Sequence, residues 1–177
     1  MRWCSSPVLA AAAAICVATA SAGVPKVYRD PVGDAERGHG DIASVQVSDS
    51  RGVVTMRIDV LSLRASDEVI VQLATRVMTD TDYALDFSKD GSWGIDHVNV
   101  GGQVTSLSPS STLTFSPNGH VYTFRFGPSV LKGTSRFAFN VHVDTAVMAD
   151  VSDWAPRELS PKSPNDWWKY ALTSIRH

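Results

Sequence analysis

The sequence contains almost no cysteine: of its 177 residues, only Cys4 and Cys16 carry a thiol. Both lie in an N-terminal segment that has the pattern of an export signal. Once that segment is removed the chain has no cysteine, which excludes disulfide bonds and thiol catalysis. An exported domain of this size without disulfides depends on its hydrophobic core, to which a bound metal can add stability.

Glutamate and helical periodicity are also scarce. Of the 18 acidic residues, 15 are aspartate. Aspartate favours turns and calcium sites, whereas glutamate favours helices. No long stretch repeats its apolar residues with the period of an α-helix, so long helices are not expected. Hydrophobic residues make up 44% and charged residues 19%, which is typical of a folded protein. The formal net charge of -2 argues against nucleic acid as a partner.

Enzyme signatures are lacking as well. Neither a G-x-S-x-G nucleophile elbow nor an H-E-x-x-H zinc motif occurs, and the histidines are scattered without paired spacing. With so many acidic residues, a pair of catalytic carboxylates of the kind that hydrolyse glycosidic bonds is compatible with the sequence. However, no residue pattern singles out one carboxyl group whose pKa would be raised. We therefore expect a protein that is not an enzyme.

The N-terminus has the pattern of a secretory signal peptide. Met1-Arg2 is a short positive start, residues 8–18 are apolar, and Ala20-Ser21-Ala22 supplies the small residues that a signal peptidase recognises. The apolar run is shorter than the roughly 20 residues that span a membrane. We therefore expect residues 1–22 to be a signal peptide and the mature protein to be secreted, with no transmembrane segment.

Export leads to a direct test. The mature chain is expected to begin at Gly23, because cleavage should follow Ala22. N-terminal sequencing of exported protein measures this. A chain that retains Cys16, or that stays in the membrane fraction, would contradict the interpretation.

Apolar and polar residues alternate with period two along much of the remaining chain. The alternation is clearest over residues 53–60, 120–126 and 137–144, which predicts half-buried strands. Residues 69–74 are apolar apart from Gln72, which predicts a strand covered on both sides. Strand pairing is therefore expected to dominate the fold.

Turn sequences separate these segments. Ser116-Pro117-Asn118-Gly119 has proline at the second turn position and glycine where a positive φ is needed. Residues 127–133 form the only short stretch that resembles a helical connector. Many short strands without intervening helices predict an all-β fold, an antiparallel two-sheet sandwich, formed by residues 23–177 as a single domain.

Aspartates gather in three loops, and calcium prefers six to eight hard oxygen ligands such as carboxylates. Short aspartate side chains on glycine-containing loops can converge on one ion. The alternative is that they form ordinary turns and caps. We expect at least one structural calcium site, with these candidate ligands: Asp30, Asp34, Asp41, Asp80, Asp82, Asp96 and Asp153.

Two tryptophans are candidate platforms for a sugar, whose apolar ring face stacks on an aromatic side chain. Trp93 lies in a loop between Gly91 and Gly94, and Trp154 lies close to Pro156. In the alternative, Trp93 packs within its loop and Trp154 closes one end of the sandwich, because large aromatic residues are mostly buried.

Four short motifs follow one another in an order that is similar to a known superfamily. They are Asp30-Pro31-Val32-Gly33-Asp34 with Asp41-Ile42, Asp80-Thr81-Asp82, Pro128-Ser129-Val130-Leu131-Lys132-Gly133, and Asp153-Trp154-Ala155-Pro156. On these motifs the chain resembles the DOMON-like sandwich superfamily and, within it, carbohydrate-binding modules of family nine. It departs from the pattern at Arg157, where another acid is expected.

The resemblance implies a distorted jelly roll with structural calcium and non-catalytic binding of a carbohydrate or other extracellular small ligand, in a secreted bacterial protein. Some members of the superfamily bind haem, so a haem-binding or redox module is an alternative. Haem needs Met or His as axial ligands, but Met56 alternates with core residues. A structural or adhesion protein of the cell surface is the third possibility.

Overall fold

The computed structural model describes most of the chain after the expected signal peptide. The described residues are 24–36, 38–75, 82–99, 102–127, 130, 134–145, 151–156 and 167–172. Their strands are β1 (Lys26–Arg29), β2 (Asp41–Ser50), β3 (Val53–Leu61), β4 (Asp67–Ala74), β5 (Tyr83–Ser88), β6 (Trp93–Val98), β7 (Val104–Ser106), β8 (Leu113–Asn118), β9 (Val121–Phe126), β10 (Arg136–Thr145), β11 (Val151–Ala155) and β12 (Trp168–Ala171).

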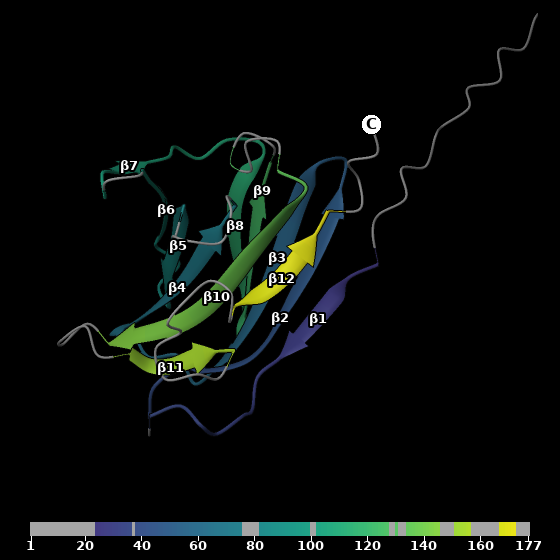
Figure 1. The fold of residues 1–177 in the computed structure, drawn as a ribbon. Coiled ribbons are helices and arrows are strands. Elements are labelled where there is room, and N and C mark those ends of the chain that lie inside the picture. Colours follow the sequence, from purple (N-terminus) through teal and green to yellow (C-terminus); the bar gives the residue numbers. More distant parts are fainter. Residues whose placement is uncertain are drawn as a thin grey trace, which may run out of the picture.

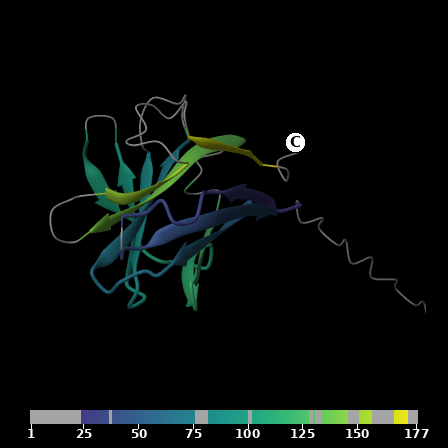
Figure 2. The ribbon, with the colours of Figure 1, turned by 90° about the horizontal axis from the view of Figure 1, so that it is seen from below.

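The strands form two antiparallel sheets (Figure 1). One sheet has five strands in the order β1-β2-β3-β9-β8. The other has seven strands, with β11-β10-β4-β5-β6-β7 side by side and β12 pairing with the first half of β10. Figure 2 shows the sheets as two layers, with β10 and β11 on one side and β1 and β2 on the other. The prediction of an all-β, two-sheet antiparallel sandwich is confirmed.

The core lies between the layers because alternate residues of each strand point inward. On β3, Val54, Met56 and Ile58 are fully buried, as the alternation predicts. On β4, the residues at 69, 71 and 73 are buried, but Ile70 and Gln72 remain partly exposed. The expectation that this strand is covered on both faces therefore holds only in part, since its outer face is half open.

The connections also follow the turn chemistry. Gly119 has a φ of 64° and directly follows β8, where the sequence places a turn. Within the expected connector at 127–133, the structure describes only Gly127 and Val130. Val130 is helical, and its N–H donates to the Gly127 carbonyl at 3.1 Å. In the described part of the chain, no helix is long and apolar enough to cross a membrane.

Candidate functional site

Three of the predicted calcium ligands meet at one end of the sandwich. One carboxylate oxygen from each of Asp30, Asp34 and Asp153 lies within 4.8 Å of the other two. Asp30 follows β1 and Asp34 lies in the loop before β2, whereas Asp153 belongs to β11 of the other sheet. The acidic cluster therefore joins the two layers of the sandwich at this end.

Asp41, the first residue of β2, borders this acidic cluster, and its charge raises the pKa of Asp153. Its Oδ2 accepts the N–H of Gly33 at 2.7 Å. Its Oδ1 is buried and accepts no hydrogen bond in the described part of the chain. Gly33 has a φ of 93°, so glycine is the residue that lets the loop turn back toward Asp41 without strain.

Electrostatics in the acidic cluster favour a cation. Burial and, to a smaller extent, the charges of Asp34 and Asp41 raise the pKa of Asp153 to about 6, against the lowering effect of a hydrogen bond from Ile42. That bond runs from the Ile42 N–H to Asp153 Oδ2 at 2.6 Å. A buried oxygen without a donor, next to like charges, fits a hard cation, and an all-oxygen ligand set fits calcium best.

The other predicted ligands lie elsewhere. Asp82 is buried before β5, where its Oδ2 accepts the N–H and the hydroxyl of Thr75 at 2.6 and 2.8 Å. Asp96 lies on β6 and accepts the hydroxyl of Ser106 on β7 at 2.6 Å. Asp80 lies outside the described residues. Within the described residues, the structure does not bring Asp82 or Asp96 to the acidic cluster.

Trp93 is packed against the core. It lies on β6 and is partly buried. Its ring centroid lies 5.9 Å from that of Phe115 and 6.1 Å from that of Phe124. This geometry favours the packing alternative for Trp93 over an open platform.

Trp154 lies on the outer face of the seven-stranded sheet. It pairs with His142 across β11 and β10, and their ring centroids are 4.4 Å apart at an interplanar angle of 31°. Trp154 is partly exposed, whereas His142 is buried. Because Asp153 is the neighbouring residue on β11, the acidic cluster and Trp154 lie on opposite faces of one strand.

Trp154 and His142 belong to a polar outer face that the sequence did not single out. Registers across the sheet align side chains of five strands on this face. One row is Trp154, His142, Ile70, Asp86 and Gly94; the next is Asn140, Gln72, Ala84 and Asp96; a third is Asp144, Glu68 and Ser88. The available signal was the alternation over residues 137–144, which puts Asn140, His142 and Asp144 on one face.

Three alternate residues of β10 each keep a buried polar atom that has no hydrogen-bond partner in the described part of the chain. The atoms are Asn140 Oδ1, His142 Nδ1 and Asp144 Oδ1. Asn140 is 0% exposed and His142 is 5% exposed. The other polar group of Asn140, its Nδ2, donates to Gln72 Oε1 at 3.0 Å. Leaving a buried polar atom unpaired is costly, so such atoms indicate a place for a ligand's polar groups.

Burial keeps His142 uncharged. It lowers the pKa of His142 to about 4, so at neutral pH the imidazole offers one N–H donor and one nitrogen acceptor. Its Nε2 lies 3.6 Å from Asp144 Oδ1, which is longer than a hydrogen bond. The outer face therefore carries a donor and several acceptors that are largely buried.

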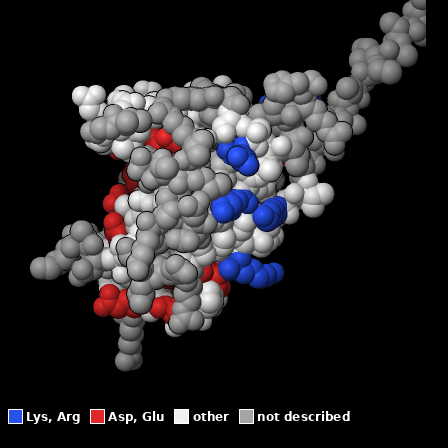
Figure 3. Space-filling view, viewed as in Figure 1, with Lys and Arg blue, Asp and Glu red and all other residues white. Residues whose placement is uncertain are grey.

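Carboxylates extend this polar face across neighbouring strands. Burial raises the pKa of Glu68, and the charges of Asp86 and Asp144 add to the effect. Burial also raises the pKa of Asp144. Figure 3 shows acidic side chains along one side of the molecule and basic side chains on another part of the same view. Carboxylate oxygens at these positions accept hydroxyl donors.

Comparison with known proteins identifies no relative. No family model, no curated protein and no solved structure matches the chain.

Proposed function

We propose that this protein is a secreted, non-catalytic binding module that holds a carbohydrate-like ligand on the polar outer face and calcium in the acidic cluster. The signal-peptide pattern of residues 1–22 supports secretion. The missing enzyme motifs are in keeping with binding rather than catalysis. Binding by such a module requires a fixed set of donors and acceptors beside an apolar surface.

The observation that carries the proposal is the row of unpartnered buried atoms on β10 next to Trp154. Asn140 Oδ1, His142 Nδ1 and Asp144 Oδ1 are spaced along one strand face. Sugars offer several hydroxyls, which both donate and accept, together with apolar C–H ring faces that pack on indole. A polyhydroxylated ligand satisfies the polar atoms while its ring covers the exposed part of Trp154.

Calcium would connect the two sheets at the strand that carries Trp154. Asp30, Asp34 and Asp41 come from the first sheet and its loop, and Asp153 comes from β11. The ion would supply a positive charge that holds these carboxylates together. Fixing Asp153 fixes the backbone of β11, and with it the position of the Trp154 ring, before a ligand arrives.

A glycan array identifies the ligand and also tests the role of Trp154. We expect Trp154→Ala to weaken binding of a glycan found on the array by about 1–3 kcal/mol, because stacking and buried area are lost. Affinity is measured by isothermal titration calorimetry. Since Trp93 packs on Phe115, Trp93→Ala should lower stability and leave the affinity of the folded protein unchanged.

A second variant separates recognition from the integrity of β11. His142→Gln keeps the strand and a polar group but moves the nitrogen, so glycan affinity should fall while the far-UV spectrum stays unchanged. If no glycan binds with or without EDTA, or if Trp154→Ala and His142→Gln both bind as the wild type does, the polar outer face is not a carbohydrate site.

A further inference from the structure

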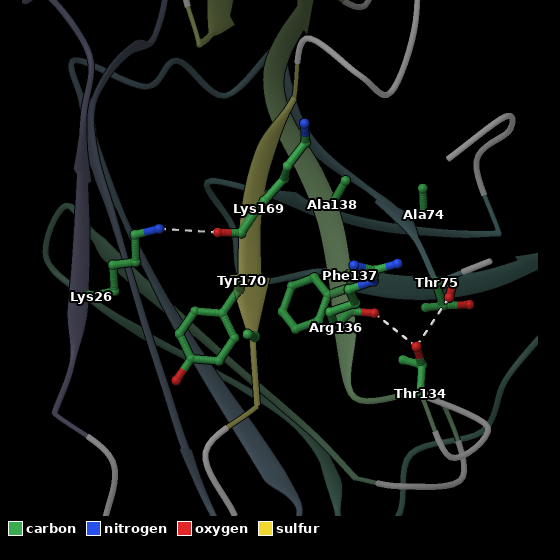
Figure 4. Close-up of a pocket in the computed structure, with 10 residues that line it drawn as sticks. Lys26, Ala74, Thr75, Thr134, Arg136, Phe137, Ala138, Lys169 and Tyr170 are labelled. Atoms are coloured by element: carbon green, nitrogen blue, oxygen red, sulfur yellow. Dashed lines mark hydrogen bonds between the residues drawn. The ribbon is translucent and has the colours of Figure 1, made fainter. Parts of the chain in front are cut away.

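A cavity whose chemistry differs from that of the polar outer face lies where β12, the start of β10 and the end of β4 meet (Figure 4). Its volume is about 670 Å³, within the range of roughly 300–1,000 Å³ that is usual for small-molecule sites. It lies nearer the start of β10 than the atoms discussed above, because Arg136 and Ala138 precede Asn140 on the same strand face.

Three cations border this cavity: Lys26 of β1, Arg136 of β10 and Lys169 of β12. No acidic side chain is among its described lining residues. In the described part of the chain, none of the three cations forms an ion pair with a carboxylate. Lys26 Nζ donates only to the Lys169 carbonyl, at 3.2 Å, and lies 4.6 Å from the ring centroid of Tyr28. The positive charge around the cavity is therefore not neutralised by these residues.

The interior of the cavity is apolar. Ala74 and Ala138 line it with small side chains, and Phe137 and Tyr170 contribute aromatic carbon. The hydroxyl of Thr134 is already engaged, since it lies 2.8 Å from the Arg136 carbonyl and 3.2 Å from the Thr75 carbonyl (Figure 4). A ligand here would be held by apolar contact and by charge rather than by neutral hydroxyl groups.

A buried donor without an acceptor among the described residues belongs to a side chain that packs on two of the lining residues. Trp167 packs on Ala74 and Ala138, two of the residues that line the cavity. It is 7% exposed, and its Nε1 is buried without an acceptor in the described part of the chain. A buried N–H that lacks an acceptor costs stability, and an anionic oxygen is the strongest acceptor that a ligand can bring.

We propose that this cavity binds a small organic anion, with a carboxylate on an apolar body. The carboxylate lies between Arg136 and Lys169, and the body covers Ala74 and Ala138. Charge complementarity selects the head group, and the apolar lining selects the body. The proposal does not depend on the carbohydrate function, because it uses other residues and another ligand chemistry.

Decanoate and decanol, both below the concentrations at which they aggregate, test this proposal by isothermal titration calorimetry. They share an apolar chain and differ in the charge of the head group. We expect saturable binding of decanoate to the wild type and at least about tenfold weaker binding of decanol. The double variant Arg136→Gln/Lys169→Gln should bind decanoate about tenfold more weakly than the wild type.

Arg125→Gln is the matched control, because Arg125 is an exposed cation on β9, in the other sheet. It should bind decanoate as the wild type does. The proposal is overturned if decanoate gives no saturable heat, if decanol binds as tightly, or if the double variant matches the control. Glycan binding is measured on the same samples, and the double variant should bind glycan as the wild type does. The anion proposal and the carbohydrate proposal can therefore be contradicted independently of each other.

Discussion

Calcium is expected to raise the melting temperature of the protein, and EDTA to lower it. An ion that binds the folded state alone stabilises it by mass action, by about 2.7 kcal/mol at a hundredfold excess over the dissociation constant. For a domain of this size, that corresponds to several degrees. Removing the ion leaves Asp34, Asp41 and Asp153 to repel one another at the end of the sandwich. Differential scanning calorimetry with calcium and with EDTA measures the difference.

Asp34→Asn tests the role of the acidic cluster, and Glu36→Gln is its control. Both substitutions remove one negative charge from the same loop, but Glu36 is exposed and is not a member of the cluster. The bond between the Glu36 N–H and the Ser152 carbonyl involves backbone only, so the control preserves it. Asp34→Asn should abolish most of the calcium-dependent difference, and Glu36→Gln should keep it. Identical melting curves with calcium and with chelator would show that the acidic cluster does not bind calcium and that its aspartates only form ordinary turns.

The fold could be predicted because its signals are local. The alternation over residues 53–60 and 137–144 corresponds to β3 and β10 within a residue or two, and glycine marks the turn that follows β8. The alternation of apolar and polar residues does not predict how far the outward-facing side chains of a sheet are shielded from solvent. Ile70 and Gln72 are apolar or uncharged, yet they remain partly exposed on β4.

The acidic cluster was predictable only where its members are close in sequence. Asp30, Asp34 and Asp41 flank one loop, so their convergence follows from a tight turn at Gly33. Asp82, by contrast, accepts hydrogen bonds from Thr75 on the preceding strand's end, and that contact depends on strand pairing. Asp49, near the end of β2, is buried and accepts the Tyr170 hydroxyl at 2.7 Å. That contact joins residues far apart in the sequence, so it too depends on the fold.

The polar outer face was missed for a related reason. Asn140 and His142 alternate with core residues, which is the pattern of an ordinary half-exposed strand. The ring contact between Trp154 and His142 follows from the register between β10 and β11. The hydrogen bond between Asn140 and Gln72 follows from the register between β10 and β4. Nothing in a single sequence specifies these registers, so a buried histidine on an outer face cannot be distinguished from a solvated one.

His142 gives the second large expected effect, a loss of stability in mild acid. Its pKa is lowered by burial from 6.5 to about 4. Between these two values the unfolded chain binds a proton that the folded protein does not, so the contribution of His142 is present above pH 6.5 and is lost as the pH falls to 4. At 1.36 kcal/mol per pH unit the loss approaches about 3 kcal/mol. Urea unfolding from pH 7 to pH 4 should therefore show the wild type losing stability relative to His142→Gln.

Asp153 is expected to act in the opposite direction when EDTA is present. Its pKa is raised by burial from 3.8 to about 6, so its contribution is complete below pH 3.8 and is lost as the pH rises through 6. From pH 7 to pH 4 the wild type should therefore gain stability relative to Asp153→Asn while it loses stability relative to His142→Gln. Calcium should reduce the Asp153 effect, because the ion stabilises the ionised carboxylate, and should leave the His142 effect intact. Parallel curves for wild type and His142→Gln would show that this imidazole titrates as an exposed one does, and that the outer face is hydrated rather than dry.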